Sequence, residues 1–494
     1  MGDWLRRHCV LLAALAVVVL RLPGLLFPAG ADEAGFTLVA RAWSPEPGSL
    51  YGAYFVDRPP LVIAVFGLAD LLGTPWGIRL LGALCAGATV LLVGRVARLV
   101  GTGAGERPAA LLAAAMLAAP LIDPVTVKGE LLALPLILAA CWWTLLATRR
   151  LPSHPLLLVG AAGAAGALAV GLKQSLIGGL VFALTLVLLS AGEGAREGVG
   201  VRRRGLVATL AVGAAVPVLL TVAWAVLTGV SLETLSYAVL GFRADASAVL
   251  AAGDQAAAMR RLWQLLGAAV AVGMGWVLVA YLASLRASWR TDAPVTGAVG
   301  AMLVVDGLGV LGGGSFWLDY LFALVPSMAI ALAVTAGRRA RRVRGWVAGV
   351  TVATTLVTYA GWAVLYVPGR HQAAAPATGR AIAAAAEPGD TLTVFGGRAD
   401  VQFASGLESP YPHLWSLPMR TLDPDLYGLQ GLVVGPEAPT WIVEWWPFDL
   451  WQPEGGARLR QLVEDRYVRH GTGCDGKPIW LRRGSTRPPV SPDC

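Results

Sequence analysis

Runs of about twenty mostly apolar residues dominate this sequence. Helices and closed barrels alone can cross a bilayer, and a helix needs roughly 20 apolar residues to do so. Charged residues make up 14% of the chain, against about a quarter in soluble domains. The sequence therefore predicts a polytopic α-helical membrane protein with about eleven spans, near residues 9–28, 76–100, 107–122, 129–148, 155–172, 174–191, 206–228, 263–284, 294–312, 316–336 and 345–367.

The arginines predict how the chain crosses the membrane. An N-terminus in the cytoplasm puts most of them in cytoplasmic loops, as the positive-inside rule requires: Arg6, Arg7, Arg95, Arg98, Arg107, Arg149, Arg150, Arg196, Arg202 to Arg204, Arg286, Arg290 and those in "GRRARRVRG". An odd number of spans then places residues 368–494 outside. The net charge of +8 reflects this topology, and we expect no nucleic-acid partner because the basic residues lie in short loops.

Residues 1–367 are predicted to form the membrane bundle, with two large external loops at 29–75 and 229–262. The first loop contains two short segments, "FTLVARAW" and "PPLVIAVFGLADLLG", that we interpret as interfacial helices. The second segment is too short to span comfortably. A tilted twelfth span there would make the number of spans even and place residues 368–494 on the cytoplasmic side. Residues 29–31, Ala-Gly-Ala, fit a signal-peptidase site, whereas Arg21 and Pro23 favour an uncleaved first span.

Residues 368–494 are predicted to form a small external α/β domain. "TGRAIAAAAEPGDTLTVFGG" is typical of a helix, a turn and a strand, and "APTWIVEWW" of a second strand. Cys474 and Cys494 are candidates for a disulfide, since both fall in this external part. The tryptophans of the domain fit core or interfacial positions, with a sugar-stacking platform as the alternative: Trp415, Trp441, Trp445, Trp446, Trp451 and Trp480.

Acidic residues follow the first predicted span. Asp32 and Glu33 lie in "GADEAG", and helical spacing of about 100° lets only one of them point into a given cavity. We choose Asp32. "YFVDRPPL" brings Asp57 and Arg58 to the same loop, where the two prolines hold Arg58 in an extended conformation. Helix capping and a solvated turn are the alternative interpretations of these two motifs.

Lysine is rare here, which makes its positions informative. Two of the three lysines, Lys128 and Lys173, lie in short external turns, "DPVTVKGEL" and "GLKQSL". An ammonium group binds phosphate as a point charge, although snorkelling to the interface is the alternative. Glu130 follows Lys128 by two positions and is placed to pair with it or to line the same cavity.

We expect the acids and bases of these motifs to meet in one external cluster at the level of the membrane surface. Such a cluster suits sugar transfer from a polyprenyl phosphate. The leaving group is a phosphate that is stable as an anion, so cations need only neutralise it. A carboxylate within hydrogen-bond reach of the acceptor can take up the acceptor proton as the anomeric carbon is attacked. We therefore predict Asp32 as the general base, with Arg58, Lys128 and Lys173 around the donor phosphate.

Several motifs together resemble the GT-C glycosyltransferases of the protein mannosyltransferase and aminoarabinose transferase superfamily. They are the Asp-Glu pair, the acid-base-Pro-Pro-Leu motif, the Arg-Leu of "GIRLLGALCAGATVLLV", Glu130, Lys173 and "FWLDYLFALVP". The resemblance implies a multi-pass protein of the bacterial plasma membrane that inverts the anomeric centre, with Asp32 as catalytic acid-base residue.

The resemblance also suggests secondary site residues. Asp319 and Tyr320 stand where relatives contact donor or acceptor, and Tyr237 and Arg243 lie in the second external loop. Some relatives bind a divalent metal through the acid before Pro-Pro, here Asp57, and a His in that loop. Residues 229–262 contain no His, so no cofactor is firmly predicted and a metal at Asp57 is left open.

The predicted partners are a polyprenyl-phosphate sugar, an external acceptor (lipid, glycan or protein) and membrane lipid. Two other functions stay open. A transporter or lipid flippase would line its path with the same charges, but transporters commonly show repeated halves and broken helices, and we find no clear repeat. The second is a non-catalytic relative that acts in envelope assembly, which the substitution of Arg58 for the usual Lys or His and the missing His leave possible.

Overall fold

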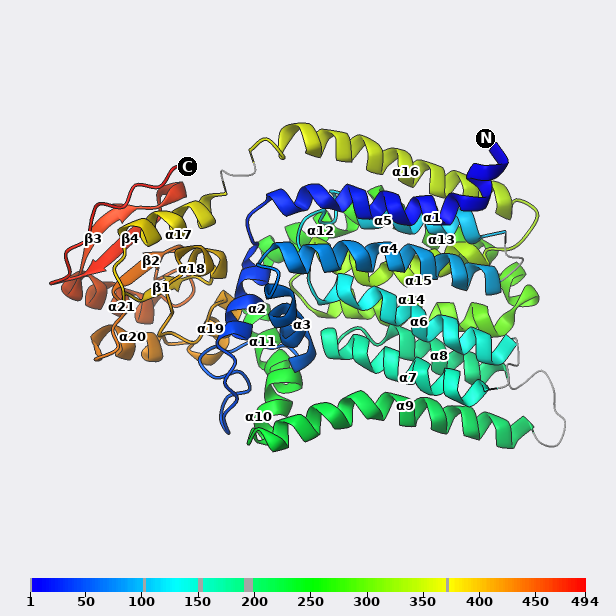
Figure 1. The fold of residues 1–494 in the computed structure, drawn as a ribbon, viewed down its shortest axis with the longest axis horizontal. Coiled ribbons are helices and arrows are strands. Elements are labelled where there is room, and N and C mark those ends of the chain that lie inside the picture. Colours follow the sequence, from blue (N-terminus) through cyan, green and yellow to red (C-terminus); the bar gives the residue numbers. More distant parts are fainter. Residues whose placement is uncertain (1, 101–103, 150–153, 191–198, 370–372) are drawn as a thin grey trace.

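The computed structural model describes residues 2–100, 104–149, 154–190, 199–369 and 373–494. Long helices lie side by side in a bundle, and a small C-terminal domain sits at one end of it, which we call the domain end (Figure 1). The bundle helices are α1 (Gly2–Arg21), α4 (Trp76–Leu99), α5 (Glu106–Ala118), α6 (Gly129–Arg149), α7 (Pro155–Leu172), α8 (Gly178–Ser190), α9 (Val199–Leu227), α12 (Gln255–Ala271), α13 (Met274–Thr291), α14 (Ala293–Gly312), α15 (Val325–Val334) and α16 (Ala340–Leu365).

Seven of the described helices are long and apolar enough to cross a membrane, and a bent pair over residues 232–271 would bring the number to eight. These seven match seven of the predicted spans. Of the other predicted spans, two form shorter apolar helices, α8 and the segment from Leu318 to Val334, and the one at 107–122 is largely covered by α5. The polytopic helical fold is thus confirmed, and the total of eleven spans stays a prediction.

The predicted span at 263–284 is not covered by one continuous helix. Helix α12 ends at Ala271 and α13 begins at Met274, so the apolar run is divided between two helices. Gly273 has a φ of +87° at this break, a conformation that favours glycine. A Cβ there would lie 2.0 Å from Thr351 Oγ1 of α16, so the close packing of α16 also requires glycine.

Short helices gather at the domain end of the bundle (Figure 1). Two short helices, α2 and α3, lie where interfacial helices were expected in residues 29–75, and the 11 residues of α3 are too few to span a bilayer. Residues 229–262, predicted as a loop, are largely helical. The short elements are η1 (Leu22–Leu26), α2 (Ala31–Arg41), α3 (Pro60–Asp70), α10 (Leu232–Ser236), the π-helix η2 (Tyr237–Gly241), α11 (Phe242–Ala251) and the 3₁₀-helix η3 (Leu318–Leu324).

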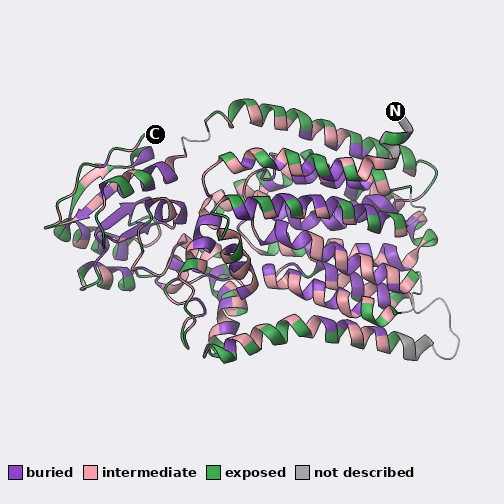
Figure 2. Cartoon of the chain, viewed as in Figure 1, coloured by how far each residue is buried: buried purple, intermediate pink, exposed green. Residues whose placement is uncertain are grey.

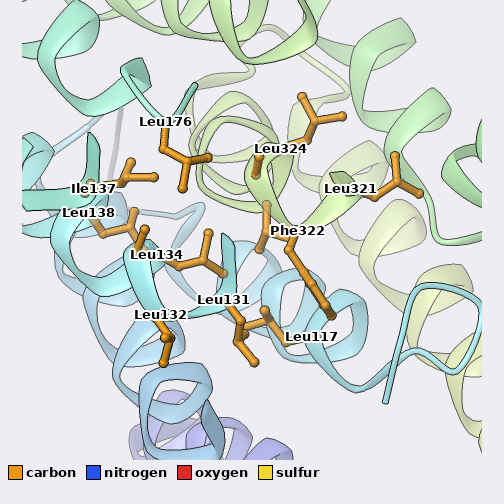
Figure 3. Close-up of a cluster of buried hydrophobic side chains, with 14 of the residues drawn as sticks. Leu117, Leu131, Leu132, Leu134, Ile137, Leu138, Leu176, Leu321, Phe322 and Leu324 are labelled. Carbon is orange, nitrogen blue, oxygen red and sulfur yellow. The ribbon is translucent and has the colours of Figure 1, made fainter. Parts of the chain in front are cut away.

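Buried leucines and small residues hold the bundle together. Figure 3 shows side chains of α5, α6 and η3, among them Leu117, Leu131 and Phe322, meeting in one apolar cluster. In the sequence "GAAGAAGALAVG" of α7, a Cβ on Gly163 would lie 2.2 Å from Leu210 O of α9. Small residues therefore let these helices approach closely. The outer faces of α9 and α16 are mostly exposed (Figure 2), as expected of surfaces that lipid covers.

The C-terminal domain, residues 373–494, is α/β as predicted. Its sheet has the order β1-β2-β4-β3, with β1 and β2 parallel and the other pairs antiparallel. Trp441 is fully buried in its core, and Cys474 and Cys494 form a disulfide. The elements are α17 (Ala374–Ala385), β1 (Leu392–Phe395), α18 (Ala399–Ser405), α19 (Ser416–Leu422), α20 (Tyr427–Val434), β2 (Trp441–Glu444), α21 (Pro453–Arg466), β3 (Tyr467–Thr472), η4 (Cys474–Gly476) and β4 (Pro478–Arg482).

Candidate active site

Asp32 lies in the first turn of α2, at the domain end of the bundle. Its Oδ2 is 2.7 Å from Lys128 Nζ, and the same ammonium lies 3.1 Å from Asp319 Oδ2. Lys128 comes from the turn before α6, and Asp319 from η3. Three segments far apart in the sequence therefore supply one cluster of two carboxylates around an ammonium group.

The C-terminal domain supplies the other partner of Asp32. Trp415 Nε1 donates a hydrogen bond of 2.9 Å to Asp32 Oδ1. Burial alone would raise the pKa of Asp32, but the nearby Lys128 ammonium, the Arg58 guanidinium and the Trp415 N–H together lower it to about 2. The acids around Lys128 raise its pKa well above the usual value, against the effect of burial. Both groups are thus charged at neutral pH.

Glu33 faces away from Asp32 and into a buried ion pair. Its Oε2 is 2.6 Å from Arg79 Nη2, and both side chains are almost completely inaccessible to solvent. The Glu33 carboxylate also accepts hydrogen bonds from the backbone N–H groups of Gly30 and Val127. Glu33, predicted with Asp32 as catalytic, is therefore held in a buried ion pair, where it fixes the loop before Lys128 against the start of α2.

Two buried arginines fix the backbone around this pair. Arg79 donates to the carbonyl groups of Gly24, Phe27 and Pro28, which lead into α2. Arg21 donates to the carbonyl groups of Leu117, Asp123 and Thr126, before and within the turn that carries Lys128. Neither set of partners could be predicted from sequence motifs, because every acceptor but Glu33 is a backbone carbonyl.

Asp57 and Arg58 form a second group of charges. Arg58 Nη1 lies 2.9 Å from Asp57 Oδ2, which also pairs with Arg243 of α11. Pro59 is extended and Pro60 begins α3, so the helix starts at the Pro-Pro step. Burial would lower the pKa of Arg58, but Asp57 and other acids keep it above its usual value.

Asp57 does not fit a divalent metal. Its Oδ2 faces two guanidinium groups, whose positive charges would repel a divalent cation. Among the described residues, no three His, Cys, Asp or Glu side chains gather in a way that could hold a metal ion. We therefore assign no step to a metal at this position.

Lys173 and Glu130 form the third group. Lys173 Nζ pairs with Glu130 and lies 3.8 Å from the centre of the Tyr320 ring, a cation–π contact. Gly129 allows this arrangement, because a Cβ there would lie 2.4 Å from Leu172 O. Burial and the nearby Arg58 lower the pKa of Lys173, although Glu130 opposes them.

A cavity of about 310 Å³ is lined in part by the residues that lead up to Asp57 in the first large loop. It is bordered by the loop over residues 48–56, by α10 and η2, and by Leu422 at the end of α19. Tyr237 is one of its lining residues and donates its hydroxyl hydrogen to Asp245 Oδ2 over 2.8 Å. Of the sequence-predicted site residues, Tyr237 lines this cavity, whereas Arg243 joins the Asp57 group.

The fold matches known structures over nearly the whole chain. ArnT from Cupriavidus metallidurans in the apo state aligns with a TM-score of 0.62 at 14% identity, covering 95% of this chain and 97% of that one. The same protein bound to undecaprenyl phosphate aligns with a TM-score of 0.61 at 14% identity, covering 98% and 99% of the two chains. This chain has the GT-C fold.

A second GT-C fold is also similar. The archaeal oligosaccharyltransferase AglB from Archaeoglobus fulgidus, in complex with an inhibitory peptide and a dolichol-phosphate, has a TM-score of 0.53 at 11% identity, covering 97% of this chain and 75% of that one. No protein-family model and no curated protein matches the sequence. The GT-C resemblance inferred from short motifs is thus confirmed at the level of the fold.

Proposed function

We propose that this protein transfers a sugar from a polyprenyl-phosphate donor to an acceptor on the face of the membrane that carries the C-terminal domain, with inversion at the anomeric carbon. Two similar structures contain a polyprenyl phosphate, undecaprenyl phosphate in ArnT and dolichol-phosphate in AglB. The observation that carries the proposal is the contact of Asp32 with Lys128 at the domain end of the bundle, because it joins a base to a cation suited to phosphate.

In the proposed reaction, a nucleophilic oxygen or nitrogen of the acceptor attacks the anomeric carbon from the side opposite the phosphate. The new bond to the acceptor forms as the bond from that carbon to the phosphate oxygen breaks, which inverts the configuration. The acceptor proton passes to Asp32, and the polyprenyl phosphate leaves with the bonding electron pair. Lys128, Lys173 and Arg58 neutralise the phosphate charge that develops.

The donor itself is expected to activate Asp32. Without substrate, Lys128 pairs with Asp32 and keeps the pKa of this carboxylate near 2, which makes it a weak base. A phosphate that draws the Lys128 ammonium toward itself removes the strongest stabilisation of the ionised carboxylate. The pKa of Asp32 then rises toward the range in which a general base is efficient.

The test uses the purified full-length protein with a panel of polyprenyl-phosphate sugars and candidate acceptors, and it follows release of the polyprenyl phosphate. We expect release with at least one donor, and a loss of at least a hundredfold in the Asp32→Asn variant. Asp465→Asn is the matched control, because Asp465 is an exposed acid of α21. Normal turnover by a folded Asp32→Asn protein would refute the role of Asp32.

Two other outcomes would favour the alternative functions. Movement of an intact donor across vesicle membranes without release of polyprenyl phosphate would indicate a transporter or flippase. Binding of a polyprenyl phosphate with neither release nor movement would indicate a non-catalytic relative. Both measurements use the same purified protein and the same donors.

A further inference from the structure

We propose that Trp415 is a positioning residue for Asp32, so that the C-terminal domain completes the active site. This inference rests on the proposed function, since it takes Asp32 as the base. Trp415 lies 383 positions from Asp32 in the sequence, yet its indole N–H is 2.9 Å from Asp32 Oδ1. Nothing in the sequence motifs had assigned this tryptophan to the site.

The backbone of the domain holds Trp415 in place. Trp415 is the N-cap residue of α19 and has an extended conformation. Gly397, in the turn after β1, has a φ of +76°, and a Cβ on it would lie 2.0 Å from Ser416 N and 2.5 Å from Trp415 C. Only glycine lets the turn approach the tryptophan backbone so closely, so the turn after β1 packs directly against Trp415.

Helix α2 is shaped to receive the indole ring. A Cβ on Gly35 would lie 2.2 Å from Trp415 Cζ2, so glycine leaves the space that the ring fills. The ring of Phe36 packs against the same indole, with 5.5 Å between ring centroids. Gly35 and Phe36 follow Asp32 within one turn of α2, and the indole therefore contacts the helix that carries the base.

Further contacts dock the domain around Trp415. Phe55 N donates a hydrogen bond of 3.0 Å to Pro412 O, and Ser409 N donates one of 3.1 Å to the Tyr54 hydroxyl oxygen. The Arg41 guanidinium lies 5.0 Å from the ring centroid of Phe403 in α18. The position of Trp415 is thus set by a broad contact between the domain and the first large loop.

This geometry has a specific consequence for the reaction. A carboxylate has about four lone-pair sites, so Asp32 can accept the Trp415 N–H and still take a proton from the acceptor. When Lys128 turns to the donor phosphate, Trp415 remains as the partner that fixes the carboxylate orientation. Loss of the indole N–H should therefore slow turnover and leave donor binding unchanged.

The experiment compares Trp415→Phe with wild type in the release assay. Phenylalanine retains an aromatic ring against Gly35 and Phe36 but lacks the N–H. We expect kcat to fall about tenfold or more, the loss typical of a hydrogen bond to a charged group, with the donor KM unchanged. Trp446→Phe is the control, because Trp446 belongs to the same domain and is 43% exposed.

A double variant separates positioning from a structural role. If Trp415 acts through Asp32, then Asp32→Asn combined with Trp415→Phe should be no slower than Asp32→Asn alone. A structural role would instead give additive losses and a lower melting temperature for Trp415→Phe. A Trp415→Phe protein with wild-type kcat would overturn the inference and leave the proposed function intact.

A second measurement does not depend on activity. In an Asp32→Cys variant, Trp415 should shield the new thiol, so adding Trp415→Ala should raise the alkylation rate by a water-soluble maleimide about tenfold. Adding Trp446→Ala should leave that rate unchanged. Equal rates with and without Trp415 would overturn the inference, whereas absence of turnover with every donor would overturn the proposed function alone.

Discussion

Two adjacent acids, Asp32 and Glu33, have different environments in this protein. Asp32 meets Lys128 and Trp415 in a partly accessible position, whereas Glu33 is fully buried against Arg79. Helical spacing predicts that the two side chains point in different directions, and Asp32 and Glu33 do have different partners. Burial then separates their roles, because a carboxylate that solvent cannot reach is not available to an acceptor.

The buried pair should matter mainly for stability. Glu33→Gln leaves the Arg79 guanidinium buried without its counter-ion, and breaking a buried ion pair costs about 3 kcal/mol or more. We expect a clearly lower melting temperature in detergent. The matched variant is Asp70→Asn, which breaks the exposed pair with Arg41 and should cost less than about 1 kcal/mol. Equal melting temperatures for the two variants would contradict the structural role of Glu33.

The sequence predicted some site residues because their chemistry was unusual for their place. Lys128 and Lys173 stood out in a chain rich in arginine, and the structure pairs them with Asp32 and Glu130. Trp415 could not be predicted in the same way. It is one of 18 tryptophans, and its importance comes from a tertiary contact with a residue 383 positions away.

At the scale of elements, hydropathy located the helices well and their interruptions poorly. The Pro-Pro step predicted the turn into α3, since proline restricts both itself and the preceding residue. The break at Gly273 was missed, because an apolar run has the same hydropathy whether one helix or two cover it. The π-helix η2 and the helices on either side of it were missed for the opposite reason, since their polar residues suggested a loop.

The short helix α10 borders the cavity, and a substitution in it tests which substrate the cavity binds. Glu233 lies in its first turn, is exposed and lines the cavity of about 310 Å³. We expect this cavity to receive the acceptor. Leu422, the last residue of α19, lines the cavity, and Trp415 at the start of the same helix contacts Asp32. Glu233→Trp should partly fill it and raise the acceptor KM severalfold, without changing the donor KM. A raised donor KM with an unchanged acceptor KM would assign the cavity to the donor instead.

The two ends of the molecule differ along its long axis. The start of α1 lies at the end of the bundle opposite the C-terminal domain (Figure 1). Arg149 pairs with Asp292 between the end of α6 and the start of α14, away from the domain end. Arg150 and Arg196, two arginines used to predict orientation, lie outside the described residues. Arg149, one of the arginines that the positive-inside rule counts as cytoplasmic, thus belongs to the end without the domain.

This difference between the two ends predicts which residues are accessible from outside the cell. A membrane-impermeant maleimide should label Asp465→Cys on intact cells, because Asp465 is exposed in the C-terminal domain. It should label Arg339→Cys, exposed before α16, only after permeabilisation. The unmodified protein is the background control, since Cys474 and Cys494 are paired and the free cysteines Cys9, Cys85 and Cys141 lie in apolar helices.

The reverse labelling pattern would mean that the whole chain has the opposite orientation in the membrane. The charged cluster and the C-terminal domain share one end of the bundle, so both would then face the cytoplasm. Labelling of both positions on intact cells would instead place the two ends of the bundle on the same side, and the number of crossings between them would have to change. The expected pattern requires an odd number of crossings before the domain, which the seven long helices and the shorter apolar ones must supply together.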